Sequence, residues 1–351
     1  MLIIVVLLLA IGSLPLHAEV QEIDTLMSEY HAIHHFNGSI LVGKQGEVIY
    51  KKGFGFADVS REIPNTANTQ FTLASVTKQF TAVTILKLVE AGHIKLDDTI
   101  IDYLPYYRND TGKIVTIHQL LNHSSGLPSY GRDKTFMRTQ SHNAVNVTNF
   151  VKDRCSDDLE FKPGSQSKYS NSGYYVLGAI IEAVTGLKYG DAVNKYIFVP
   201  LEMNDSGFNI SSAGGSRSAI GYQQYGPTFE PTINVHASVA FSAGGLYSTV
   251  EDLFKWDHAL YSDNFLPKNL LTKMISPSLK LHGYGVKVGA INLANSTKRF
   301  VAHGGALFGF NNYMIHFLDD DYVIAILSNG GQPPLSAVQD IVKILYELPY
   351  S

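Results

Sequence analysis

The sequence predicts an α+β fold in which strands from both ends of the chain form one antiparallel sheet, with a helical region inserted between them. Paired apolar runs lie near both termini, and each pair is joined by a short polar segment, as in a β-hairpin. The middle of the chain has the pattern of helices and loops. Hairpins pair antiparallel, unlike the alternating strands and helices of a doubly wound fold, and we expect helices to flank the sheet.

Composition excludes several classes of protein. The chain has 351 residues, 45% of them hydrophobic and 17% charged, so it can bury a sizeable core and is not intrinsically disordered. A net charge of −4 without a basic stripe argues against a nucleic-acid partner. The single cysteine, Cys155, excludes a disulfide framework and a cysteine-based zinc site.

The first 18 residues are predicted to be a signal peptide. Leu2–Ala10 is an uninterrupted apolar run, shorter than the ~20 residues that span a bilayer, and we expect a helix-breaking segment from Ile11 to Ala18. Cleavage after Ala18 gives a mature chain that begins at Glu19. We therefore expect an exported protein, periplasmic or secreted, with no stable membrane insertion after cleavage. An uncleaved N-terminal anchor is the alternative.

Five apolar segments and one helix outline the catalytic domain expected over residues 19–351. Its sheet subdomain is predicted from about 19–70 and 275–351. A third strand, Arg299–Ala302, precedes the second hairpin, and a final helix covers about Ser336–Leu348. The two hairpins are Ser39–Gly43 with Val48–Lys51, and Asn312–Phe317 with Tyr322–Leu327.

Two groups of residues resemble metal ligands without forming a convincing site. Asp319–Asp321 is an acidic triplet at a hairpin tip, where a solvated turn is the usual structure. His31, His34 and His35 are spaced to place two imidazoles on one face of a helix, but no carboxylate or HExxH pattern accompanies them. We expect no metal and no other cofactor.

The segment Phe71–Phe80 carries the sharpest chemical signal. A helix is predicted to begin here and run to Ala91, with Gly92 as its C-terminal stop. Ser75 and Lys78 lie three residues apart, on the same side of that helix. A serine hydroxyl becomes a good nucleophile when a base takes its proton, and a desolvated lysine can be that base. The Ser-x-x-Lys pattern is common by chance, so it acquires meaning only with other motifs.

Two further motifs follow in order, Tyr169-Ser170-Asn171 and His303-Gly304-Gly305. Together with Ser75-x-x-Lys78 they resemble the serine β-lactamase and penicillin-binding-protein superfamily. The branch that the chain resembles most contains class C β-lactamases, D-alanyl-D-alanine carboxypeptidases and esterases, which have Tyr-x-Asn at the second motif. Leu120–Leu127 and Ser242–Thr249 support the resemblance, which spans about Phe36 to Leu327.

The resemblance implies a role for each motif residue. Ser75 is the acylated nucleophile, Lys78 shares its proton, and Tyr169 transfers protons to the leaving group and then activates water. Either Lys78 or Tyr169 is the base, so the pair is assigned jointly. Asn171 is expected to hold Lys78 and the amide of the substrate.

The third motif is expected to shape the substrate site. The backbone N–H groups of Ser75 and Ala306 form the oxyanion hole, while Gly304 and Gly305 let the strand edge approach the substrate. Lysine is usual at the position of His303 in the β-lactamases of this branch. Because histidine is mostly neutral near pH 7, its presence argues against efficient β-lactam hydrolysis.

Three functions are consistent with these residues. The first is a secreted serine hydrolase that forms an acyl-enzyme on Ser75 and acts on D-alanyl peptides or on small esters and amides. The second is a class C-like β-lactamase, and the third is a catalytically silent binding or sensor module. The intact motifs argue against the third, and an α/β-hydrolase is excluded because no G-x-S-x-G occurs. We favour the first, with a peptide or small molecule as the only expected partner.

Overall fold

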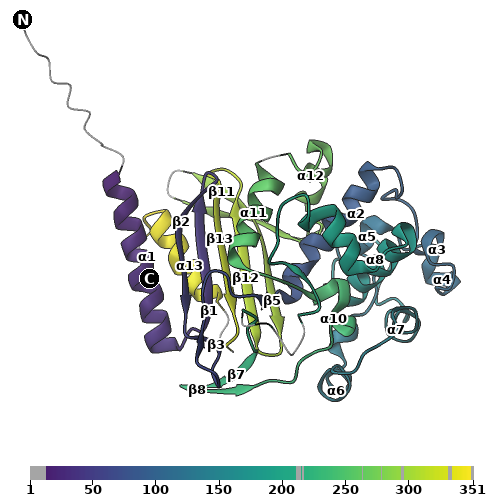
Figure 1. Cartoon of the computed structure of the whole chain (residues 1–351). Helices are drawn as coiled ribbons and strands as arrows, with labels where there is room; N and C mark the ends of the chain where they lie inside the picture. Colours follow the sequence, from purple (N-terminus) through teal and green to yellow (C-terminus); the bar gives the residue numbers. More distant parts are fainter. Residues whose placement is uncertain are drawn as a thin grey trace, which may run out of the picture.

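A six-stranded antiparallel sheet forms the centre of the computed structural model (Figure 1), in the order β10-β11-β12-β13-β1-β2. The structure describes residues 13–210, 215, 217–262, 264–277, 279–293, 296–330 and 334–348. N-terminal β1 pairs with C-terminal β13, so both ends of the chain build one sheet, as predicted. The strands of this sheet are β1 (Gly38–Lys44), β2 (Glu47–Phe54), β10 (Lys287–Asn292), β11 (Thr297–Leu307), β12 (Phe310–Phe317) and β13 (Tyr322–Ser328).

Both predicted hairpins are present, and β11 is longer than expected. It continues through the His-Gly-Gly motif to Leu307, whereas the sequence predicted a strand only to Ala302. The neighbouring strand β10, which was not predicted, pairs with β11 only as far as Lys287 opposite Ala302. The edge of β11 from His303 onward is therefore unpaired by β10, and it faces the inserted helical region.

Two helices cover the outer face of the sheet, α1 (Ser13–His34) and α13 (Leu335–Leu345), and the helical region covers the inner face (Figure 1). Strand β13 is buried on both sides. Ile324 and Ile326 belong to the outer core with Ile23 of α1, while Val323 and Leu327 belong to the inner core. Burial on both faces explains why this strand is a continuous apolar run.

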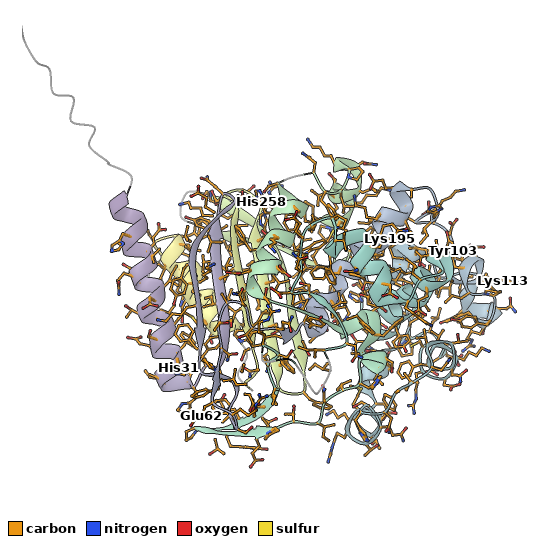
Figure 2. The ribbon with its side chains drawn as sticks, in the orientation of Figure 1. His31, Glu62, Tyr103, Lys113, Lys195 and His258 are labelled. Carbon is orange, nitrogen blue, oxygen red and sulfur yellow. The ribbon has the colours of Figure 1, made fainter. Side chains whose placement is uncertain are left out.

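The inserted region consists of short helices around two longer ones, α2 and α8. In Figure 2, Tyr103 and Lys113 mark its end farthest from α1. Its helices are α2 (Thr77–Glu90), α3 (Ile100–Tyr103), α4 (Asn109–Gly112), α5 (Ile117–Leu121), α6 (Lys134–Thr139), α7 (Val147–Arg154), α8 (Asn171–Thr185), α9 (Tyr189–Val193), α10 (Ala237–Gly244), α11 (Val250–Tyr261) and α12 (Lys268–Met274). Two 3₁₀ turns, η1 (Ala74–Val76) and η2 (Tyr130–Arg132), and a π-helix, η3 (Asn194–Phe198), complete the helical elements of the part described. Minor strands are β3 (Phe56–Asp58), β4 (Ile63–Pro64), β5 (Phe71–Thr72), β6 (Gly207–Phe208), β7 (Tyr222–Tyr225), β8 (Thr228–Pro231) and β9 (Leu246–Ser248).

The N-terminal segment differs from one expectation. Helix α1 begins at Ser13 and continues through Ala18, so the predicted helix break is wrong for the part of that segment described. Residues 1–12 lie outside the described residues, and cleavage after Ala18 stays a prediction. No helix within the described ranges is long and apolar enough to cross a membrane.

The histidine spacing at the end of α1 also differs from expectation. The helix ends at His34, and His35 has a left-handed backbone with a φ of 54°, so it is not on the helix face. His31 (Figure 2) lies with Nδ1 2.7 Å from the Phe36 carbonyl oxygen, a contact that closes the end of the helix. Among the described residues, no group of three His, Cys, Asp or Glu side chains is arranged to hold a metal ion.

The acidic triplet lies in the turn between β12 and β13. Asp319 forms an ion pair with Arg299, and Asp320 forms one with Lys298. Both lysine and arginine come from the start of β11. These contacts tie two adjacent hairpins together, which gives the carboxylates a structural role.

Candidate active site

Ser75 and Lys78 meet where the η1 turn continues into α2. Ser75 is the one partly exposed residue between Phe71 and Phe80, while Lys78 is fully buried. Lys78 Nζ lies 3.1 Å from Ser75 Oγ and donates a hydrogen bond of 2.6 Å to the carbonyl oxygen of Ala243. Burial holds the pKa of Lys78 well below its usual value. A neutral amine at this distance can accept the proton of the Ser75 hydroxyl.

The backbone around Ser75 is shaped by two unusual residues. Ala74, just before the serine, has a φ of 49°, in the region that residues with a side chain rarely occupy. Gly305 of β11 lies against the same turn: a Cβ there would be 2.3 Å from the Leu73 carbonyl oxygen and 3.3 Å from Ser75 N. Only glycine fits this approach, which brings the edge of β11 beside the serine.

Tyr169 lies beside both Ser75 and Lys78, at the end of the loop that leads into α8. Burial raises the pKa of Tyr169, and a hydrogen bond with Ser75 opposes that shift only in part. The ring centroid is 4.9 Å from Lys78 Nζ. At neutral pH the site therefore holds a phenol rather than a phenolate, beside an amine whose charged form is disfavoured.

His303 is buried at the start of the free edge of β11. Its Nδ1 lies 2.6 Å from the carbonyl oxygen of Gly304, so Nδ1 carries the proton and Nε2 is left as an acceptor. Burial, together with repulsion from Lys78, lowers the pKa of His303 to about 3. Its ring centroid is 6.1 Å from that of Tyr169. The imidazole is thus uncharged throughout the physiological range.

Asn171 is the first residue of α8, and its placement differs in part from expectation. The structure describes no hydrogen bond between Asn171 and Lys78, whose described acceptors are Ser75 and the Ala243 carbonyl. Instead, Asn171 Oδ1 is buried without a partner among the described residues. An unpaired carbonyl oxygen in this position is available to a donor on a substrate.

A small cavity of about 50 Å³ lies beside the nucleophile. It is lined by both predicted oxyanion-hole residues, Ser75 and Ala306, and by Asn171. Gly304 has space around it, since a Cβ there would come no closer than 3.4 Å to Tyr313. Three of the predicted site residues thus line one cavity beside the edge of β11. Of the two glycines of the motif, close packing demands glycine only at Gly305.

Comparisons with known proteins identify the family of the chain. A family model described as Beta-lactamase matches residues 23–347. The chain belongs to the Beta-lactamase family. It is 31% identical to Penicillin-binding protein 4* of Bacillus subtilis, over 94% of this chain and 77% of that protein. It is 28% identical to Protein flp of Staphylococcus aureus, over 88% of this chain but only 63% of that protein.

Solved structures show the same fold. The octameric penicillin-binding protein homologue from Pyrococcus abyssi superimposes with a TM-score of 0.82 at 29% identity, covering 94% of this chain and 78% of that one. A D-amino acid amidase from Ochrobactrum anthropi has a TM-score of 0.77 at 23% identity, covering 95% of this chain and 99% of that chain, a likeness that shows the fold alone. The resemblance and the fold class predicted from sequence are therefore confirmed, and the chain is a serine hydrolase of the β-lactamase and penicillin-binding-protein superfamily.

Within this Beta-lactamase-family site, His123 is a residue whose role the sequence did not reveal. Its carbonyl oxygen accepts a hydrogen bond of 2.9 Å from Lys168 N, and its Nδ1 accepts one of 3.2 Å from Ser170 N. The two donors flank Tyr169, whose ring centroid is 4.5 Å from that of the imidazole. His123 itself has a φ of 62°. One buried residue thus holds the backbone on both sides of Tyr169 and contacts its ring.

The Ala243 carbonyl is a second contributor that the sequence did not reveal. Helix α10 is kinked at Phe241, which has a φ of 41° and a ψ of −135°. After this kink, the carbonyl oxygens of Ser242 and Ala243 accept hydrogen bonds from Thr81 and Lys78 of α2. Leu120–Leu127 and Ser242–Thr249 were markers of the family in the sequence. The features that act in the site are the left-handed backbone conformation of His123 and the backbone carbonyl of Ala243. Neither feature can be recognised from residue types alone.

Proposed function

We propose that this protein is an exported serine hydrolase that cleaves D-alanyl peptides, or small esters and amides, through an acyl-enzyme on Ser75. The observation that carries the proposal is a buried Lys78, with its pKa lowered by burial, whose Nζ lies 3.1 Å from Ser75 Oγ. In acylation, Lys78 takes the hydroxyl proton as Oγ bonds to the carbonyl carbon. The backbone N–H groups of Ser75 and Ala306 stabilise the resulting oxyanion.

The later steps use Tyr169. When the tetrahedral intermediate collapses, the leaving amine or alcohol takes a proton from the Tyr169 phenol, which Lys78 restores. A water molecule then attacks the acyl carbon and gives one proton to the same pair. That proton passes to Ser75 Oγ as the bond between Oγ and the acyl carbon breaks and the carboxylic acid leaves. The low pKa of Lys78 and the high pKa of Tyr169 support Lys78 as the base and Tyr169 as the acid in the free protein.

Uncharged His303 favours this function over strict β-lactamase activity, because it offers a substrate carboxylate no permanent positive charge. A panel of nitrocefin, p-nitrophenyl esters and D-Ala-D-Ala peptides separates the two. We expect release of D-alanine or p-nitrophenol at rates well above nitrocefin hydrolysis. Rapid turnover of nitrocefin alone would favour the β-lactamase.

The nucleophile is tested by covalent labelling. A fluorophosphonate or a penicillin should add one adduct mass, mapped to the peptide that contains Ser75, and Ser75→Ala should take up none. Labelling of another serine that persists in Ser75→Ala would refute the assignment.

The position of the N-terminus is tested by measuring the intact mass of the exported protein. We expect the chain to begin at or near Glu19. Removal of residues 1–18 leaves Ile23 and Met27, which pack in the outer core.

A further inference from the structure

Three cavities lie end to end on one side of Ser75. The first is the cavity of about 50 Å³ at the serine, the second measures about 280 Å³, and the third about 370 Å³. Adjacent cavities have walls in common, so they form one groove, which we call the acyl groove. The first and second share Val235, Ala240, Gly244 and Leu307, and the second and third share Thr72, Ile210 and Asn234.

The direction of β11 indicates which part of a substrate enters this groove. The proton donor to the leaving group, Tyr169, lies beside His303, at the beginning of the free edge of the strand. Leu307, at the end of β11, lines both the first and the second cavity. The leaving group therefore belongs at the His303 end, and the acyl part of the substrate extends past Leu307 into the groove.

The middle of the groove is polar. Asn209 and Asn234 present amide groups, and both side chains belong to exposed residues. His142, also exposed, and His236, at the start of α10, complete the polar wall. Amide and imidazole groups can donate to and accept from the main chain of an extended peptide. A long aliphatic chain would gain little from these side chains.

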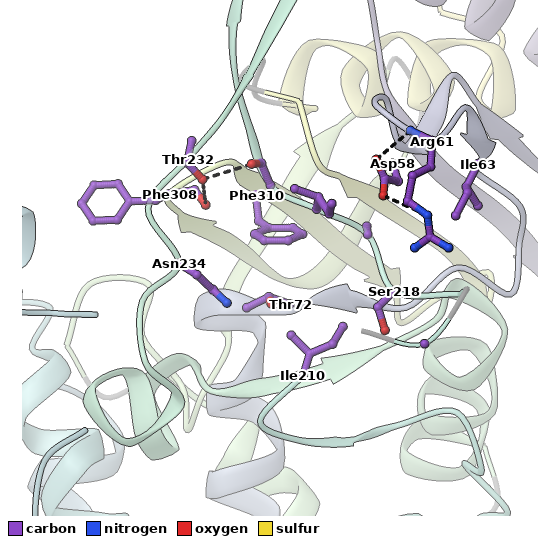
Figure 3. Close-up of a pocket in the computed structure, with 14 residues that line it drawn as sticks. Asp58, Arg61, Ile63, Thr72, Ile210, Ser218, Thr232, Asn234, Phe308 and Phe310 are labelled. Atoms are coloured by element: carbon purple, nitrogen blue, oxygen red, sulfur yellow. Dashed lines mark hydrogen bonds and ion pairs between the residues drawn. The ribbon is translucent and has the colours of Figure 1, made fainter. Parts of the chain in front are cut away.

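The far end of the groove has a charged corner (Figure 3). Asp58 is buried, and its carboxylate accepts hydrogen bonds from Ser60 Oγ at 2.7 Å and from Arg61 N at 3.1 Å. The Arg61 side chain is 65% exposed, and its Nε is 3.9 Å from Asp58 Oδ2. That separation is too long for a hydrogen bond. Asp58 thus orients Arg61 while leaving the N–H donors of the guanidinium available to another anion.

We propose that the acyl groove binds the acyl arm of a peptide substrate in extended form, and that Arg61 recognises a carboxylate on that arm. This inference rests on the proposed function for the orientation of the substrate. It adds a substrate class: peptides that end in D-alanine and carry an acidic residue several positions before the bond that is cleaved. Arginine suits this role because its planar guanidinium can bind both oxygens of a carboxylate.

A peptide series tests the proposal. Each peptide is acetylated, ends in D-Ala-D-Ala and has about three to five residues before that dipeptide. One peptide of each pair carries Glu at one of these positions, and its matched control carries Gln at the same position. We measure kcat/KM with the unaltered protein and Kd with Ser75→Ala, which leaves the peptides intact. At one position we expect the Glu peptide to be favoured about 3- to 10-fold, the range of a solvent-accessible charged contact.

Arg61→Ala should abolish this preference for Glu without changing turnover of the short substrate acetyl-D-Ala-D-Ala. Arg299→Ala is the matched control, because Arg299 is also 65% exposed and pairs with an aspartate, but it lies at the opposite end of β11. It should keep the preference. Equal handling of Glu and Gln peptides at every position, or a preference that survives in Arg61→Ala or disappears in Arg299→Ala, would overturn the inference.

The two measurements separate this inference from the proposed function. If the unaltered protein hydrolyses none of the peptides, the peptide-cleaving form of the proposed function fails, while the Kd ratio from Ser75→Ala still decides the role of Arg61. If the short peptide is hydrolysed but charge is not discriminated, the proposed function stands and the acyl groove does not recognise a carboxylate.

Discussion

The two sides of Ser75 differ in their access to water. On one side, which we call the base side, Lys78, Tyr169, His123 and His303 are enclosed by protein, and burial is the largest cause of each of their pKa shifts. On the other side, the acyl groove presents exposed residues such as His142, Asn234 and Arg61. Proton transfer from serine to lysine requires an amine that is not already charged, and burial favours that neutral form of Lys78. Recognition of a long substrate requires groups that a peptide can reach.

The base side also lacks a fixed countercharge. Among the described residues no carboxylate pairs with Lys78, and its partners are a hydroxyl and a backbone carbonyl. An adjacent aspartate would favour the ammonium and remove the base. The acyl groove has the opposite arrangement, because Asp58 accompanies Arg61 there. Loss of the Lys78 amine should consequently alter catalysis strongly, whereas a charge change in the groove should alter only substrate preference.

The largest effect is expected for Lys78→Met, which removes the base while keeping an unbranched side chain. We expect turnover of esters and peptides to fall about 10³- to 10⁴-fold, the scale of general base catalysis. In the unaltered protein, activity should decline as the pH falls through the pKa of Lys78, because the ammonium cannot take the proton of Ser75. Lys78→Met should lose that dependence in its residual activity. Retention of the acidic limb in this variant would place the base elsewhere.

The same substitution should stabilise the fold. Burial lowers the pKa of Lys78 well below 10.5, so between the two values the unfolded chain binds a proton that the folded chain lacks. The free energy of unfolding therefore rises with pH across that window. Methionine removes this penalty, and we expect a higher Tm near neutral pH, by about 1–2 °C for each kcal/mol recovered. A lower Tm would show that the Lys78 hydrogen bonds outweigh its desolvation.

A smaller effect is expected for substitution of His123. This substitution changes the orientation of Tyr169 without altering Ser75, so it tests how the enclosed base side positions its proton donor. His123→Ala should lower peptide turnover by up to about 10²-fold, because a displaced Tyr169 delivers its proton poorly to the leaving group. His123→Asn should recover much of the loss. Asparagine tolerates the left-handed backbone, and its Oδ1 can accept the Ser170 N–H.

The leaving group distinguishes positioning from general damage. Fluoride departs from a fluorophosphonate without needing a proton, so labelling of Ser75 should slow far less in His123→Ala than peptide hydrolysis does. Equal losses of labelling and hydrolysis, together with a lowered Tm, would mean that His123 only supports the fold.

The sequence was informative where the physical signal is local. Strand β13 is an almost continuous apolar run that is buried on both faces, β12 is mostly buried, and the turn between them is short, so their hairpin was predictable. β10 was missed because Lys287–Asn292 is short, contains glycine and is largely exposed. Helices of four residues such as α3 and α4 are fixed by tertiary contacts and have too few turns for a periodic signal.

The same distinction applies to the site. Ser75 and Lys78 lie one helical turn apart, so their spacing predicted their contact. His123 acts from a segment 46 residues before Tyr169, through its backbone conformation and a ring nitrogen, and no local pattern encodes such a contact. The residues of the acyl groove come from several short strands, from loops, from α10 and from the end of β11, which only the folded chain brings together.

The smallest effect, and the one most specific to substrate charge, is expected for His303→Lys. With a pKa of about 3, His303 is uncharged at every pH at which the protein is assayed, so the ratio of kcat/KM for anionic and neutral substrates should stay flat from about pH 5 to 8. A lysine there gives a substrate carboxylate a charged donor, worth about 1.5–3 kcal/mol, or roughly 10- to 150-fold in rate. Burial and the nearby Lys78 oppose the new ammonium, so we expect about 10-fold for anionic peptides and β-lactams and little change for p-nitrophenyl esters. His303→Gln, which is uncharged, should show no such gain. Equal changes for neutral and anionic substrates in His303→Lys would show that residue 303 shapes the edge of β11 without contacting the carboxylate.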